Sequence, residues 1–135
     1  MTDAPQLYLM TPAGAQASAL GPMLADVERL LGGVVAPALV DSVARVRSAV
    51  IAVGEAMAGL AEAGPSAVEA SARDFAFSLT RIYTGALMLE HAQWGTARGD
   101  RAALAAAVRW CAQDLSPVSV LDDTHQSDSR ALALG

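Results

Sequence analysis

The chain has 135 residues, the size of one ordinary domain, which is long enough to bury a hydrophobic core without disulfide bonds or a structural metal. Its net charge of −5 and its nine arginines, spread along the sequence with no lysine, exclude the dense positive charge of a nucleic-acid-binding protein and also exclude Schiff-base catalysis. The single cysteine excludes an internal disulfide and any site built from several cysteines.

The apolar residues are mostly small. Hydrophobic residues make up 53 % of the chain and aromatic residues only 4 %, while thirty residues are alanine, which favours closely packed helices. Charged residues interrupt every long apolar stretch, so we expect a soluble protein with no membrane contact. Residues 1–10 lack the basic start and continuous apolar run of a secretory signal, so we expect a cytoplasmic location.

The first predicted helix covers residues 20–31. Residues 1–19, which mix prolines and a glycine with small residues, predict a flexible lead-in. The pair Gly32-Gly33 predicts the end of the helix, and a helix stop fully explains it. The apolar face of this helix consists of Met23, Val27, Leu30 and Leu31.

The second predicted helix begins near Pro37 and ends at the Gly64-Pro65 break. Its apolar residues are spaced alternately four and three apart, which places them in one stripe along the helix. They are Leu39, Val43, Val46, Val50, Val53, Met57 and Leu60.

The third predicted helix opens with Ser66 and Glu69 at capping-box spacing and continues to the region of Arg98-Gly99. Its apolar stripe has the same spacing and consists of Val68, Ala72, Phe75, Leu79, Ile82, Ala86 and Leu89. From Ile82 to Leu89 the helix is apolar on nearly every side, so we expect it to be the most enclosed element or to face another chain.

The fourth predicted helix has Asp100 as its N-cap and ends at Ser116-Pro117. Its stripe consists of Leu104, Val108, Cys111 and Leu115. Short breaks between helices with such stripes predict an all-α fold, an antiparallel up-down four-helix bundle over residues 20–117, with a polar C-terminal tail over residues 118–135. Alanines bury little area each, so the largest losses on substitution by alanine are expected at Phe75, Leu79, Ile82 and Leu89.

Few residues suggest a catalytic or reactive role. Glu90 and His91 are weak catalytic candidates beside Trp94, but adjacent helical residues point about 100° apart, so a structural histidine is the favoured reading. Cys111 occupies an inward position, where burial is expected to raise the pKa of its thiol.

A metal site is a further, weak possibility in the polar tail, where His125 lies among several carboxylates but nothing pre-organises them. Those carboxylates are Asp122, Asp123 and Asp128.

The third helix carries more apolar surface than one stripe can absorb, which predicts an interface with another protein. The predicted interface residues are Phe77, Tyr83, Leu87, Met88 and Trp94.

The segments LMLEHAQW (87–94) and AAVRWCAQDL (106–115), within residues 70–114, resemble the C-terminal helical region of acyl-CoA dehydrogenase-like flavoproteins, in particular the longer, extended members. In that family a helical domain, a β-domain and a C-terminal bundle together hold FAD and an acyl-CoA thioester, and a glutamate abstracts a proton. This chain is too short for all three domains, and it has neither the flavin-binding glutamine-and-glycine motif nor a glutamate in a matching context, so the resemblance carries over the scaffold only.

The leading hypothesis is therefore a non-catalytic interaction or oligomerisation module, an accessory subunit or excised domain that associates with itself or with an acyl-CoA dehydrogenase-like partner. FAD would enter only with a partner or with the rest of a larger chain. The alternative is a small bundle that binds an apolar or acyl-CoA-type ligand, with activity centred near Glu90 and His91.

Overall fold

The structure, a computed structural model, describes residues 12–118 and 132–133. The elements in chain order are α2 (Pro12–Gly32), the 3-10 helix η1 (Pro37–Leu39), α3 (Val40–Ala63), α4 (Pro65–Thr96) and α5 (Arg101–Cys111). No strand occurs within the described ranges.

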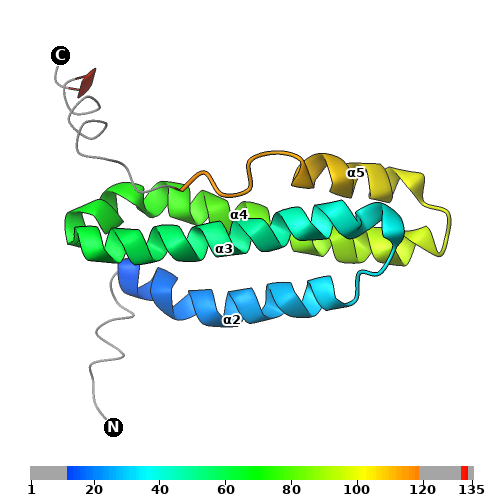
Figure 1. The fold of residues 1–135 in the computed structure, drawn as a ribbon, viewed down its shortest axis with the longest axis horizontal. Helices are drawn as coiled ribbons and strands as arrows, with labels where there is room; N and C mark the ends of the chain where they lie inside the picture. The colour runs from blue at the N-terminus through cyan, green and yellow to red at the C-terminus, as the bar shows by residue number, and fades with distance from the viewer. Residues whose placement is uncertain (1–11, 119–131, 134–135) are drawn as a thin grey trace, which may run out of the picture.

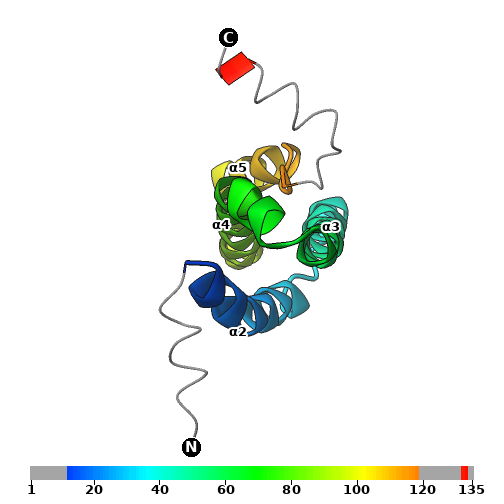
Figure 2. The ribbon, with the colours of Figure 1, turned by 90° about the vertical axis from the view of Figure 1, so that its left-hand side faces the viewer.

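The four α-helices form an antiparallel up-down bundle. Figure 1 shows that each helix runs opposite to the one before it, with short connections at the two ends. Seen end-on in Figure 2, α3 and α4 pack against each other, with α2 below and α5 above this pair. The all-α antiparallel four-helix bundle predicted from the sequence is confirmed.

The helix ends follow local backbone chemistry. Pro37 and Pro65 occupy first-turn positions of η1 and α4, where a missing N–H is harmless. The Asp100 side chain accepts a hydrogen bond from the Ala103 N–H at 3.0 Å, which confirms its prediction as an N-cap. The predicted capping box at Ser66 is wrong, because α4 begins one residue earlier, at Pro65, and its N-cap residue Gly64 makes no side-chain bond.

Two helix ends differ from the predictions. Helix α2 begins at Pro12 rather than near Leu20, because proline suits the first turn and alanines alternate through residues 13–19. Helix α5 ends at Cys111 rather than at Ser116, because the Asp114 carboxylate accepts the Ser116 N–H at 3.1 Å and stabilises a turn instead. The chain then lies against the bundle, so that Val118, predicted to begin the tail, is buried.

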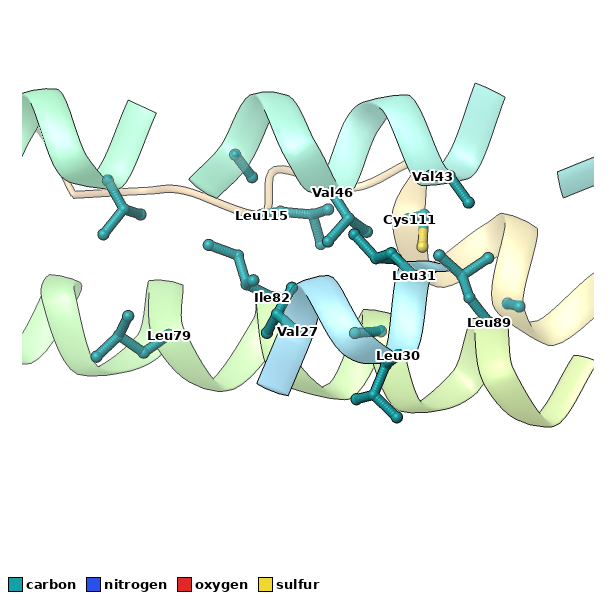
Figure 3. Packing of buried hydrophobic residues seen from close by; sticks show 14 of the residues in the cluster. Val27, Leu30, Leu31, Val43, Val46, Leu79, Ile82, Leu89, Cys111 and Leu115 are labelled. Carbon is teal, nitrogen blue, oxygen red and sulfur yellow. The ribbon is translucent and has the colours of Figure 1, made fainter. Parts of the chain in front are cut away.

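The core lies where all four helices meet. Figure 3 shows side chains of α2, α3, α4 and the segment after α5 pointing toward one another. The predicted core positions Phe75, Leu79, Ile82 and Leu89 are all buried. Fully buried large side chains come from each part of the bundle and include Val27, Leu31, Leu39, Val46, Val53, Ile82 and Leu89.

The stripe predicted for α5 is wrong at one position. Val108 is 39 % exposed, whereas Ala107 is fully buried. Small residues let α5 lie close to α4: a Cβ atom on Gly85 would be 3.4 Å from a Trp110 ring carbon and 3.5 Å from the Cys111 sulfur. A larger residue than Ala107 would hold the helices apart.

None of the helices described here is both long enough and apolar enough to span a bilayer.

Candidate functional site

The outer face of α4 carries three large apolar side chains that the bundle leaves uncovered. Phe77 is 46 %, Leu87 43 % and Trp94 54 % exposed. They belong to the five predicted interface residues; the other two, Tyr83 and Met88, are half-buried and pack against the core. Because α2, α3 and α5 pack on the other sides of α4, this face is open in the described part of the chain (Figure 2).

Arginines lie over the aromatic rings near both ends of this face. The Arg73 guanidinium lies 5.4 Å from the centre of the Phe77 ring, and that of Arg98 lies 3.8 Å from the centre of the Trp94 ring. His91 stacks on Trp94, with 5.6 Å between the ring centres and an angle of 22°. Each pair is three or four residues apart, so the α-helix itself brings the partners together.

A shallow apolar recess opens beside Leu87. Its walls are Thr84, Leu87, Met88 and His91 of α4 and two alanines of α5, Ala103 and Ala106, and its volume is about 240 Å³. The four residues of α4 have the spacing i, i+3, i+4 and i+7. Four residues at this spacing form the hole into which a side chain of a neighbouring helix inserts.

A polar cluster joins α2 to the flank of this face. The Tyr83 hydroxyl donates a hydrogen bond to Asp26, and Arg29 donates to the same carboxylate at 2.6 Å and 2.8 Å. The hydrogen bond from Tyr83, followed by the bond and charge of Arg29, lowers the pKa of Asp26. The hydrogen bond to Asp26 raises the pKa of Tyr83.

We expect Tyr83→Phe to lower the melting temperature at neutral pH, because the bond between α2 and α4 is lost. Because the pKa of Asp26 is lowered in the folded state, the stability that its carboxylate contributes is lost as the pH falls through that pKa. Because the pKa of Tyr83 is raised, the stability that its hydroxyl contributes is lost as the pH rises beyond about 10. Melting curves across this pH range should therefore show the largest difference between variant and wild type near neutrality. An equal difference at every pH would contradict the assignment.

The structure does not bring Glu90 and His91 together as an acid–base pair. His91 lines the recess on the α5 side and stacks on Trp94. Glu90 lies on the other flank, where its charge acts on Arg29 and Tyr83. Both residues are exposed, and His91 is held on the surface of α4 by its ring stack with Trp94.

Cys111 is fully buried, as predicted, and burial raises the pKa of its thiol to about 11. It lines the base of an open groove of about 630 Å³ between α3 and the segment after α5, whose other residues include Asp41, Arg45 and Asp114. A thiol with this pKa is almost entirely protonated at neutral pH, so it is a poor nucleophile.

A metal site finds no support in the described ranges, where no three histidine, cysteine or acidic side chains are grouped suitably. The weak candidate at His125, with its neighbouring aspartates, lies outside the described residues.

The sequence model of a known family, described as acyl-CoA dehydrogenase 11 C-terminal domain-like, matches residues 19–134. The chain belongs to this family. No curated protein and no solved structure matches it. The match confirms the resemblance to the C-terminal domain of acyl-CoA dehydrogenase-like proteins that the helical segments 87–94 and 106–115 suggested.

The acyl-CoA dehydrogenase 11 C-terminal domain-like unit contains α3, α4, α5 and all of α2 from Ala19 onward, and therefore the whole outer face of α4. Sequence analysis missed Arg73, Thr84 and Arg98 beside that face and the two alanines of α5, Ala103 and Ala106, that line the recess. The spacing of four residues between Arg73 and Phe77, and between Trp94 and Arg98, could have revealed the two arginine–aromatic pairs. The recess could not be predicted, because its second wall depends on how α5 packs.

Proposed function

We propose that this acyl-CoA dehydrogenase-like C-terminal domain is a helical interaction module that contributes a packing surface rather than catalytic groups. Its partner is a second copy of the chain or an acyl-CoA dehydrogenase-like protein. FAD, if it takes part, is held by that partner or by the rest of a larger chain.

The uncovered face of α4 supports this proposal most directly. Phe77, Leu87 and Trp94 expose about half of their side chains along one helix, and arginines extend over two of the rings. Tryptophan, arginine and other aromatic residues are enriched in protein interfaces and carry much of their binding energy.

The alternative, a bundle that binds an apolar or acyl-CoA-type ligand, has weaker support. The apolar recess of about 240 Å³ is smaller than ligand pockets of about 300–1,000 Å³. The groove of about 630 Å³ beside Cys111 is large enough, but it is open, and polar and charged side chains such as Asp41, Arg45 and Asp114 line it, so it does not suit an apolar ligand. Glu90 and His91, the residues near which activity would be centred, point in different directions from α4, His91 toward the recess and Glu90 toward Arg29 of α2.

Light scattering after size exclusion, together with titration of an acyl-CoA dehydrogenase-like flavoprotein from the same source, tests the proposal. We expect a mass above the 13.8 kDa of one chain, or stoichiometric binding to the flavoprotein. The double substitution Leu87→Ser and Trp94→Ser should abolish either association while the helical circular-dichroism signal stays unchanged. A wild-type chain that stays single at all concentrations and binds no flavoprotein would overturn the proposal, as would a variant that associates normally.

A further inference from the structure

A second stripe of residues runs along α4 on the side away from the core, with the apolar residues Ala70, Phe77, Leu87 and Trp94 among polar ones. It extends from Ser66 to Trp94 in alternating steps of four and three residues, a length of about 42 Å along the helix. Its central members are Phe77, Thr80, Thr84, Leu87, His91 and Trp94. All of them are exposed except Thr84, which is half-buried. This spacing is that of a helix that packs along its length against another helix, yet no helix of the described chain covers it.

We propose that a second copy of this chain covers the stripe, with the two α4 helices antiparallel and Phe77 of each opposite Leu87 of the other. This inference rests on the proposed function and names the partner of the same surface. The two-fold axis passes between Thr80 and Thr84, close to the middle of Pro65–Thr96, so the two helices overlap along nearly their full length.

The recess on α4 has an occupant in this arrangement. In this register the residue opposite the centre of the hole formed by Thr84, Leu87, Met88 and His91 is Phe77 of the second copy. The recess is apolar and about 240 Å³ in volume, and its wall on the α5 side is low because the side chains there are alanines. A two-fold axis repeats the contact, so both exposed phenylalanine rings are buried.

Side-chain size favours the antiparallel arrangement over a parallel one. Antiparallel helices in this register place Trp94 opposite Ala70, so the largest residue of the stripe meets one of the smallest. Parallel helices would place Trp94 against Trp94, which holds the two helices apart at that end.

Charge favours the same register. Arg73 lies across from Glu90 and His91 of the second copy. A parallel pair would instead bring each Arg73 opposite the other. The selected register therefore brings Arg73 and Glu90 together at both symmetry-related contacts.

Disulfide trapping tests the register. Arg73→Cys chains mixed with His91→Cys chains should form a mixed disulfide dimer under mild oxidation, because these positions lie opposite each other. Neither variant alone should crosslink, since like positions lie about 27 Å apart along the antiparallel helices. Wild-type chain is the control, because its Cys111 is buried. A dimer in which Arg73→Cys crosslinks to itself, or in which the mixture fails to crosslink, would overturn this inference and leave the proposed function standing.

Dimer affinity gives a second test. Phe77→Ala should weaken self-association roughly a hundredfold, because two buried rings are lost. The matched control, Ile51→Ala, removes a side chain of α3 that is 61 % exposed, compared with 46 % for Phe77, and should leave the affinity unchanged. Arg73→Glu should weaken association on the order of tenfold, and adding Glu90→Arg should restore it. A wild-type chain that stays single yet binds the flavoprotein, or equal affinities for Phe77→Ala and Ile51→Ala, would refute the second copy as the occupant.

Discussion

Replacing Ile82 by alanine is expected to lower the free energy of unfolding by about 2–5 kcal/mol. Ile82 is fully buried on α4 and lies beside Val27 of α2 and near Leu115 of the segment after α5 (Figure 3). Its environment is assembled from separate helices, which cannot all move inward to fill the space left by the lost atoms. Because small domains have a net stability of about 5–15 kcal/mol, this one change should remove a large fraction of it.

Chemical denaturation at a single temperature measures this loss, and Ile51→Ala is the matched control. Ile51 is the same residue type in a neighbouring helix, but it is 61 % exposed, so its loss should be below about 0.5 kcal/mol. The slope of the unfolding free energy with denaturant should be the same in both variants. Equal losses for the two substitutions would show that Ile82 does not lie in the core.

The arrangement of the helices could be predicted because core contacts repeat at helical spacing. In the stripe predicted for the second helix, which η1 and α3 form, five of the seven residues are buried and the other two, Val50 and Met57, are half-buried. The short connections then leave antiparallel packing as the simplest arrangement. Periodicity reports which side of a helix is covered, so it predicted the bundle without any knowledge of individual contacts.

The same reasoning failed where residue size determined the packing distance. At Val108 the pattern favoured the larger residue as the core position, but α5 packs closely enough on Gly85 that its neighbour Ala107 is the buried one. The end of α5 was not predicted for another reason. The Asp114 side chain accepts a hydrogen bond from the Ser116 N–H, and the turn that this bond stabilises competes with continuation of the helix.

Polar contacts between helices were the least predictable part of the candidate site. Tyr83 was predicted at an interface with another chain, but its hydroxyl bonds to Asp26 of α2, and the two residues are 57 positions apart. Ser78, fully buried on α4, accepts the Val118 N–H at 3.1 Å and so fixes the segment after α5. Such pairs depend on the relative rotation and height of two helices, which a periodic pattern does not define.

Substitution of Gln93 is expected to cause the second large loss of stability, because its one side-chain oxygen accepts hydrogen bonds from two backbone N–H groups. Its Oε1 accepts hydrogen bonds from the Val35 N–H at 2.9 Å and the Ala36 N–H at 2.8 Å, in the connection between α2 and η1. Ala36 is buried, so without Gln93 its N–H group would lose its acceptor and would be poorly accessible to water as a replacement. We expect Gln93→Leu, which keeps the side-chain size, to lower the free energy of unfolding by about 1–3 kcal/mol.

The conservative variant Gln93→Glu separates hydrogen bonding from packing. A carboxylate oxygen can accept the same two N–H groups, so this variant should retain most of the stability that Gln93→Leu loses. Amide hydrogen exchange adds a local measurement: the Ala36 amide should exchange faster in the leucine variant than in the glutamate variant. If both variants lost equal stability, the side chain would act through its packing alone, and the connection between α2 and α3 would have to be held by other contacts.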